Sequence, residues 1–392
     1  MSHRGVVVVS RVLVSWALPF MPIAVPAAYA ALPDPVSQQD LFAFPGADAN
    51  PGDAVSAGLG LADRWLGNSA FENPAARPRR GVELTPVLLR VNRQDLRARF
   101  HDYSETSAFM DGAGAELGAS LGRWTAVAYA WQPVLRHEES AYSRGTPGGF
   151  PPPAVVSQSQ EQRETRAGLA LSLGGAAVRG GIAAEWFRRE DHDLLNEQSG
   201  VPEPGTHDAT VTVSGVSPRA GAQAVLGGGG RHPVVIGLGL GEVPAGDVDV
   251  HQTVTLSDFA SDTSWTAHRG AHWDGGISAR VAVTPEWGVL GAAGGTSAYD
   301  WGTLAVTTGA GAMWALGAEY HDSTLPWSAR IGFGEQLTSG TPEPRASMVG
   351  IGLGWALEGF TLDFAALRRT LRRPAEPNSY DDHLLASLRV WF

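Results

Sequence analysis

Few residues of this 392-residue chain have the types and spacing that chemistry requires. Glu190-Asp191-His192-Asp193 groups three carboxylates with one imidazole, a set that could bind a divalent cation or form a solvated external loop. His268 and His272, four residues apart, are a weaker pair of candidate metal ligands. The chain has no cysteine, which excludes disulfides and cysteine-based metal sites. We favour the solvated loop and expect neither a bound metal nor a cofactor.

The first thirty residues have the pattern of a secretory leader. Arg4 and Arg11 flank a short apolar run, a second apolar stretch spans 12–25, and Ala28-Tyr29-Ala30 forms a cleavage pattern. We therefore predict a signal peptide over residues 1–30, with a membrane anchor as the alternative. Without it, 27 arginines remain against 40 acidic residues, a net charge of −13 that argues against a nucleic-acid partner.

From about Gly81 onward the hydrophobic pattern has a period of two, which predicts β-strands. In residues 349–357, large apolar side chains alternate with Gly and Ala. Tight turns alternate with longer polar links, which lie at 138–161, 190–206, 256–272 and 371–380. Short turns on one side and long loops on the other are typical of an outer-membrane barrel. A soluble β-sandwich is the alternative, but the aromatic residues near the strand ends and the Gly-rich opposite face favour the barrel.

The strand pattern predicts an all-β fold, a transmembrane antiparallel β-barrel of about fourteen strands. One candidate is in excess, and we expect the miscount in 205–260. The candidates are 81–92, 114–122, 124–137, 162–174, 176–189, 209–228, 231–242, 247–257, 274–284, 286–296, 308–321, 325–336, 345–357, 359–371 and 381–392.

Charged residues alternate with the apolar face of these strands, which suits the lumen of a barrel. Mutual pairing that fills the interior is their default role, and a part in substrate passage is the alternative. The candidate lumen-lining residues are Arg166, Arg179, Glu185, Arg280, Glu319, Arg330 and Asp363.

The last ten residues, HLLASLRVWF, form an amphipathic strand that ends in phenylalanine. Such an ending resembles the signal by which the barrel-assembly machinery of Gram-negative outer membranes recognises its clients. The residues of this predicted assembly signal are Leu384, Ala386, Leu388, Val390 and Phe392.

No serine and histidine stand in an arrangement typical of an outer-membrane lipid hydrolase, so we predict no catalytic residue and no enzyme. Two other classes stay open at this point. One is a transporter, and the other is a non-catalytic secretion shuttle or structural barrel.

The stretch that leads into the first strand, VSAGLGLADRWLGNSAFENPAARP, carries the most specific signal. With Gly58, Gly60 and Asn73-Pro74-Ala75 it resembles the N-terminal region of the long-chain fatty acid transporter family of the FadL/TodX type. Barrels resembling the secretion shuttle PorV look like relatives with a different role. A polar turn that merely starts the first strand is the bland alternative for Asn73-Pro74-Ala75.

The resemblance implies an outer-membrane barrel of a Gram-negative bacterium that passes hydrophobic compounds such as fatty acids. It implies an N-terminal hatch in the lumen at residues 31–78, a barrel over 79–392, and lateral exit where a strand is kinked. Gly174-Gly175 and Gly180-Gly181 are candidates for that kink. The implied partners are outer-membrane lipid, the barrel-assembly machinery and a hydrophobic small molecule. The substrate path would run past Asn73, Pro74 and Ala75.

Overall fold

Nearly all described residues lie in antiparallel strands, and the exception is the short helix α3 (Ala54–Gly58) with the turns that follow it. All described residues belong to the compact unit Gln39–Phe392, so the predicted signal peptide lies outside them. The computed structural model describes residues 53–66, 69–75, 81–98, 101–111, 114–132, 134–144, 154–198, 205–227, 232–256, 259–300, 307–338, 345–372 and 379–391.

Among these residues no helix has both the length and the apolar character needed to cross a membrane.

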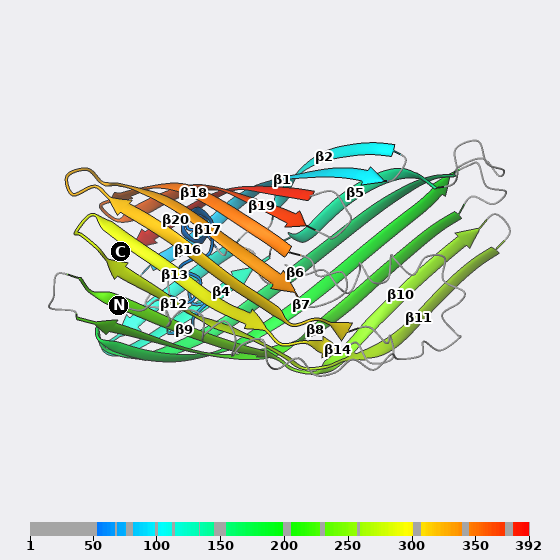
Figure 1. Ribbon diagram of the computed structural model, residues 1–392. Helices are drawn as coiled ribbons and strands as arrows, with labels where there is room; N and C mark the ends of the chain where they lie inside the picture. The colour runs from blue at the N-terminus through cyan, green and yellow to red at the C-terminus, as the bar shows by residue number, and fades with distance from the viewer. Residues whose placement is uncertain are drawn as a thin grey trace, which may run out of the picture. The chain divides into compact units, whose positions relative to one another are not determined.

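The sheet closes into a ring because the first strand is paired on both edges. Gly81 lies opposite Trp391 on one side and opposite Gly118 on the other. The pairings confirm an antiparallel barrel, with fourteen strands in its wall among the described residues (Figure 1). In ring order the strands are β1 (Gly81–Ala98), β3 (Gly114–Leu121), β4 (Trp124–Trp131), β6 (Ala154–Gly174), β7 (Val178–Gln198), β8 (Gly205–Leu226), β9 (Val234–Val243), β12 (His272–Ala282), β13 (Trp287–Thr296), β16 (Gly311–His321), β17 (Trp327–Thr338), β18 (Arg345–Leu357), β19 (Phe360–Arg372) and β20 (Ser379–Trp391).

Four further strands lengthen this sheet beyond the ring: β2 (His101–Asp111), β5 (Val134–Arg144), β10 (Gly246–Leu256) and β11 (Phe259–Arg269). β10 pairs with the first half of β8 and with β11 (Figure 1). The candidate wall strand 247–257 is therefore wrong, and it accounts for the excess strand in 205–260. Its alternation arises because the extension also buries one face, where Val248 and Val250 are almost fully enclosed.

Three of the predicted polar links consist largely of strand. β5 and β6 occupy most of 138–161, β7 continues to Gln198, and β11 fills most of 256–272. The acidic stretch at 190–193 therefore lies in β7 and is not a loop. Hydrophobic alternation could not reveal these extensions because their strands carry polar residues on both faces, and only backbone pairing identifies them.

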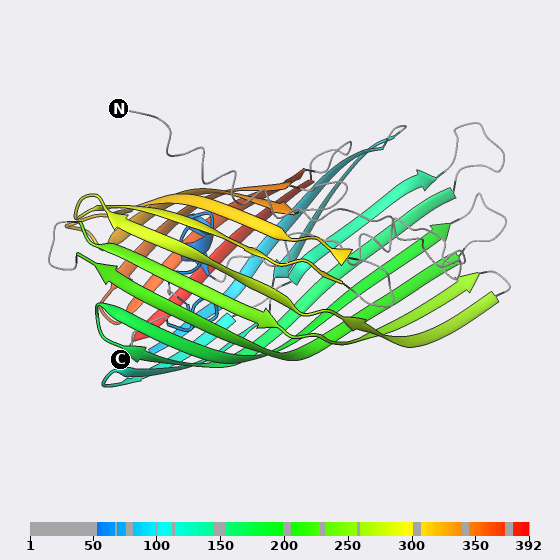
Figure 2. The ribbon, with the colours of Figure 1, turned by 60° about the horizontal axis from the view of Figure 1, so that its bottom comes forward.

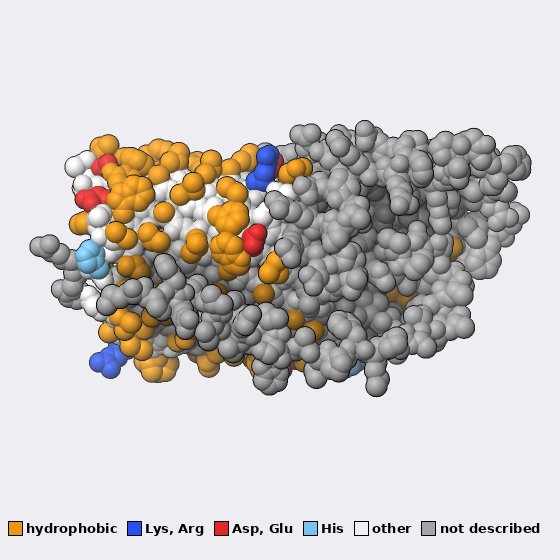
Figure 3. All heavy atoms as spheres, viewed as in Figure 1, with side chains coloured by type: hydrophobic (Ala, Val, Ile, Leu, Met, Phe, Trp, Pro, Cys, Tyr) orange, Lys and Arg blue, Asp and Glu red, His pale blue; other side chains and the backbone are white. Residues whose placement is uncertain are grey.

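The outer face of the ring exposes large apolar side chains in rows. On β6, Leu169, Leu171 and Leu173 are 54%, 44% and 46% exposed, whereas Glu185 on the inner face of β7 is fully buried. Figure 3 shows apolar side chains gathered over the half of the barrel that carries the tight turns. An exposed apolar band of this kind, with polar groups inside, is the arrangement of a lipid-facing barrel wall.

Aromatic side chains mark the edge of this band beside the tight turns. Trp287, Tyr320 and Trp327 come from three neighbouring strands, with successive ring centroids 5.0 and 5.3 Å apart. Further along the strands, Trp186 and Trp314 are exposed on the same outer face. The aromatic residues beside the tight turns and those further along the strands agree with the two expected aromatic belts, where amphipathic rings meet the membrane–water boundary.

Local side-chain bonds fix the tight turn between β16 and β17. Asp322 accepts hydrogen bonds from the backbone N–H groups of Thr324 and Leu325, each at 2.8 Å. Hydrogen bonds from Thr324 and from the Leu325 backbone lower the pKa of Asp322 to about 2. The carboxylate thus satisfies turn donors that a short β-hairpin leaves unpaired.

Candidate functional site

Described residues 53–66 and 69–75, here called the inner segment, begin with a capped helical turn. Asp53 is the N-cap of α3 and accepts from the Ser56 N–H at 2.7 Å. Two contacts to β20 hold this end: Arg389 donates to Asp53 at 2.5 Å, and the Ala54 N–H donates to Ser387 Oγ at 2.8 Å. After α3 the chain turns sharply, with Gly60 and Leu61 at positive φ.

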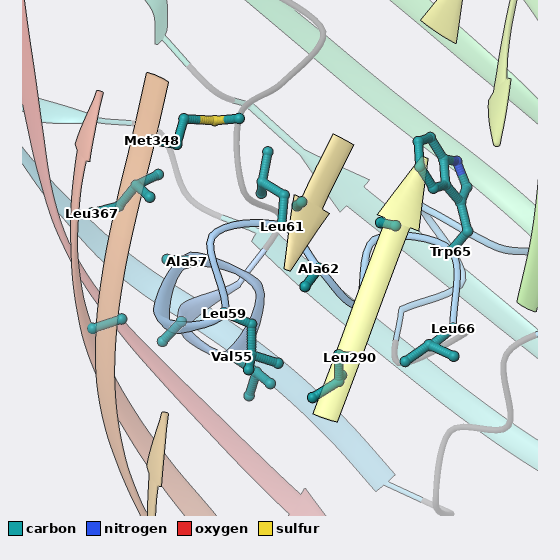
Figure 4. Packing of buried hydrophobic residues seen from close by; sticks show 14 of the residues in the cluster. Val55, Ala57, Leu59, Leu61, Ala62, Trp65, Leu66, Leu290, Met348 and Leu367 are labelled. Carbon is teal, nitrogen blue, oxygen red and sulfur yellow. The ribbon is translucent and has the colours of Figure 1, made fainter. Parts of the chain in front are cut away.

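The inner segment packs an apolar core mainly against one side of the ring, from β13 to β20. Leu59 and Leu61 are almost fully buried with Met348 of β18 and Leu367 of β19 (Figure 4). Further along, the Trp65 N–H donates to Ser278 Oγ of β12 at 3.1 Å. Still further along, Asn73 donates to the Ala222 oxygen of β8, which lies seven strands from β19 in the ring of fourteen, so the segment crosses the lumen (Figure 2).

Asn73 connects the end of the segment to the wall. Its Nδ2 donates to the backbone oxygen of Trp65 at 2.8 Å and to that of Ala222 in β8 at 3.2 Å. Its Oδ1 accepts from the Ala75 N–H at 2.9 Å. Asn73, Pro74 and Ala75 are buried, so this tripeptide is an internal contact between segment and barrel.

Glycines on the inner face of the wall make room for the backbone of the segment. A Cβ added at Gly181 of β7 would lie 2.2 Å from the Pro74 oxygen, and one at Gly221 of β8 would lie 1.9 Å from Asn73 Oδ1. The same holds at Gly237 and Gly332, where Trp65 O and the Leu59 carbonyl carbon would lie at 1.8 and 1.9 Å. We call these four glycines the glycine seat, because a larger residue at any of them would clash with the inner segment.

A charged network lines the lumen beside the seat. Glu185 is fully buried and accepts from Arg166 at 3.1 Å, Arg219 at 3.3 Å and the Tyr129 hydroxyl at 2.9 Å. Arg219 also donates to Asp274 of β12 at 2.7 Å. The network links five strands of the wall, and each buried charge has a charged partner, as burial requires.

A second charged network lies next to α3 and extends toward the tight turns. Glu319 accepts from Arg330 at 2.9 Å and lies 3.1 Å from both Arg280 and His321. Arg330 also donates to Asp363 of β19 at 2.6 Å. Among the predicted lumen residues, Glu319, Arg330, Asp363 and Arg280 are thus brought together, and Arg166 meets Glu185 in the first network.

Arg179 has hydroxyl partners on two neighbouring strands. Its guanidinium donates to the hydroxyl groups of Thr125 at 3.1 Å and Ser172 at 3.4 Å, both on inner faces of neighbouring strands. It is buried near the tight-turn end of β7.

Glu72 of the inner segment is a buried carboxyl group. Burial raises the pKa of Glu72 well above its ordinary value of 4.5, and the nearby Asp63 and Asp53 carboxylates raise it further. Glu72 is only 7% exposed. Neutral Glu72 therefore fits the docked segment better than the anion.

The wall ladder is interrupted next to the segment. β3 pairs with β4 up to Gly114 and Trp131, and beyond them the pairing changes: β2 pairs with β1, and β5 pairs with β6. No ladder between β2 and β5 occurs among the described residues. The hydrogen-bonded ladder of the wall thus has a break that starts at Gly114 and Trp131, although parts of β2 and β5 still lie near each other.

The predicted kink positions do not coincide with this break. Gly174 and Gly175 lie at the tight turn between β6 and β7, and Gly180 and Gly181 are paired continuously on both sides of β7. Glycine alone therefore did not identify the interruption.

The predicted assembly signal lies on β20. Leu384 and Val390 are exposed on the outer face, whereas Leu385 and Ser387 of the inner face are buried. Phe392 lies outside the described residues. Within the described part of the chain, no cluster of three or more His, Cys, Asp or Glu residues could hold a metal ion.

Sequence reasoning missed several residues of the site. Arg219 lies in the segment 209–228 whose strand assignment was uncertain, and Asp274 was read only as a strand start. Phe71, Tyr129 and Trp131 were missed because their roles depend on how the inner segment crosses the lumen, which strand periodicity does not encode.

A closed antiparallel ring with an apolar outer face and a charged interior defines the chain as a transmembrane β-barrel. Neither a protein-family model nor a curated protein matches the sequence. Solved structures do match. A TodX deltaS2S3 mutant, described as a monoaromatic hydrocarbon channel, has a TM-score of 0.62 at 13% identity and covers 88% of this chain and 100% of its own.

Two further structures agree with this fold. A Pseudomonas aeruginosa FadL homologue gives a TM-score of 0.62 at 12% identity, over 89% of this chain and 100% of its own. The Pseudomonas putida toluene transporter TodX gives 0.60 at 13% identity, over 90% and 100%. At such identities the likeness establishes a common fold.

Proposed function

We propose that this protein is an outer-membrane barrel of a Gram-negative bacterium that passes hydrophobic compounds, such as fatty acids, without catalysis. The apolar outer face supports residence in a lipid bilayer, since each strand of the ring pairs with a neighbour on both edges. The matched structures described as hydrocarbon channels and toluene transporters support the class of compound.

The observation that carries the proposal is the inner segment seated on glycines beside a break in the wall. In our proposal, residues 31–78 form a hatch, and Asn73, Pro74 and Ala75 connect it to the substrate path. A hydrophobic compound enters the lumen at the extended end and leaves through the break between β2 and β5 into the membrane. Movement of the segment opens that path.

The charged lumen residues have a role in this route as well. Arg166 and Arg219 both pair with Glu185, so these three side chains fill part of the lumen. In our proposal they restrict the passage of free ions. The exposed outer residues of β20, from Leu384 to Val390, would serve recognition by the barrel-assembly machinery.

Uptake of a radiolabelled long-chain fatty acid and of a small sugar should be compared in host cells with and without the protein. We expect faster uptake of the fatty acid and unchanged uptake of the sugar. Unchanged fatty-acid uptake, together with a secreted protein that co-purifies with the barrel, would instead establish a secretion shuttle. Release of fatty acid from phospholipid by the purified protein would establish a lipid hydrolase.

A further inference from the structure

The ring of Phe71, in the inner segment, is held by side chains from three wall strands. Its centroid lies 4.6 Å from that of Trp131 and 6.0 Å from that of Tyr129, both on β4. The guanidinium carbons of Arg166 and Arg219 lie 5.3 and 5.8 Å from the same centroid. Two aromatic rings and two cations around one ring form a recognition site for a π-system.

This clasp, defined as Tyr129, Trp131, Arg166 and Arg219, is organised without help from Phe71. Arg166 and Arg219 are both bound to Glu185, and the Tyr129 hydroxyl donates to the same carboxylate. The wall therefore holds the two guanidinium groups and the Tyr129 ring in place when the inner segment moves. A preorganised site loses little affinity to rearrangement when another ring takes the place of Phe71.

The clasp also offers a hydrogen-bond donor that Phe71 cannot use. Trp131 is 7% exposed, and its indole N–H is buried without a hydrogen-bond partner. Buried donors are almost always paired, so an unpaired one marks a place where a ligand acceptor improves the contact. A phenylalanine side chain carries no acceptor.

The clasp borders open space and the wall break. Phe71, Trp131, Arg166 and Arg219 line a cavity of about 560 Å³, a volume that includes space open to solvent. Trp131 is also the last β4 residue paired with β3 before the wall ladder stops. A molecule bound there would lie between the lumen and the proposed exit.

We propose that the clasp is a binding site for a single aromatic ring that bears a hydrogen-bond acceptor, and that Phe71 occupies it in the closed state. The inference rests on the proposed transport function and names the compound class that this site selects. The ligand replaces Phe71 between Trp131 and the two arginines, and its acceptor receives the indole N–H. Displacement of Phe71 releases the end of the inner segment next to the wall break.

Three compounds of similar size separate the contributions of ring and acceptor. Benzaldehyde has both, toluene has the ring alone, and methylcyclohexane has neither. Their apparent affinities for the full chain in detergent can be measured by saturation-transfer NMR, with empty micelles as the background. For the wild-type protein we expect the order benzaldehyde, then toluene, then methylcyclohexane.

Phe71→Ala tests the competition. Because the variant empties the clasp, we expect about tenfold tighter binding of benzaldehyde and toluene if Phe71 occupies the clasp about nine-tenths of the time. Methylcyclohexane should gain much less. Equal gains for all three compounds would show a mere cavity and would overturn the proposal, as would no gain for benzaldehyde.

Trp131→Phe tests the donor, since it keeps an aromatic ring and removes the N–H. We expect benzaldehyde to lose severalfold more affinity than toluene, and equal losses would overturn the assignment of the acceptor. Failure of the clasp is distinguishable from failure of transport. If the clasp fails while fatty-acid uptake by the wild-type protein persists, the proposed function stands and only the ring site is wrong.

Discussion

At the scale of single residues, glycine decides where the inner segment can lie. Neighbouring positions on β7 differ sharply: a Cβ at Gly181 would lie 2.2 Å from Pro74 O, whereas at Gly180 the nearest atom is at 4.0 Å. Gly180 is on the outer face and Gly181 on the inner face, as strand alternation requires. A single methyl group at position 181 should therefore displace the inner segment, whereas one at position 180 should not.

Gly181→Ala should displace the end of the segment and leave the barrel assembled. The chain has no cysteine, so Ala70→Cys, at a fully buried position, gives a single reporter thiol. We expect maleimide labelling of Cys at 70 to be roughly 5- to 150-fold faster in the Gly181→Ala background, since overpacking costs about 1–3 kcal/mol.

Gly180→Ala is the matched control for that experiment and should label at the parent rate. If both alanine variants label alike, the glycine seat does not position the segment.

The docking of the segment should also depend on pH through Glu72. Its pKa is raised on docking, so the stabilisation is fully present below pH 4.5 and is lost as the pH rises through the raised pKa. Labelling at position 70, corrected for thiol ionisation, should therefore increase with pH. Glu72→Gln should remove this dependence, and a dependence that persists in that variant would assign it to another group.

At the scale of elements, the wall and its extension are separable. β9 pairs directly with β12, with Val243 opposite His272, although the β10–β11 hairpin lies between them in sequence. Removing residues 246–269 leaves a four-residue connection between two strands that are already partners. Hairpin loops of this length are common.

Deletion of 246–269 should therefore leave the fourteen-strand ring intact. Heat-modifiable migration in SDS gels, the usual sign of a closed barrel, should be retained. Loss of the compact band would show that β10 and β11 are required for closure.

The elements could be predicted from the sequence to the extent that one face of each strand is apolar. β16–β19 follow the predicted alternation closely because their outer rows meet lipid and their inner rows meet the segment. β5, β11 and the far half of β7 were missed, since polar residues on both faces carry no period. The inner segment was located by its resemblance alone, and its contacts with the wall follow from closure of the ring.

At the scale of the whole barrel, the inner segment bridges the strands on either side of β1, where the first and last strands of the ring pair. It binds β20 through Asp53 and Arg389, and it binds β3 on the other side of β1 through Ser69 Oγ, which lies 2.5 Å from Glu116. β1 itself has a register shift between Leu84 and Val87 opposite β20. The segment therefore bridges an irregular part of the wall.

Arg389→Met should weaken this bridge, since it removes the ion pair with Asp53 while keeping an apolar stem. We expect a loss of roughly 1–3 kcal/mol in the free energy of unfolding, because the buried Asp53 loses a charged partner. In heat-modifiability gels the barrel should therefore unfold at a lower temperature. Arg368→Met, at an exposed ion pair with Asp382, is the control and should have little effect. Equal shifts in both variants would contradict a role for the bridge.

The central claim is that docking of the inner segment controls passage of hydrophobic compounds, and Asn73→Ala tests it most directly. The variant removes three hydrogen bonds, including the one to Ala222 of the wall, at a cost of about 2–4 kcal/mol. The measurement is fatty-acid uptake by cells with equal amounts of heat-modifiable barrel. We predict severalfold faster uptake in Asn73→Ala than in the wild type. Unchanged uptake, with the segment shown to be displaced by labelling at position 70, would contradict the claim.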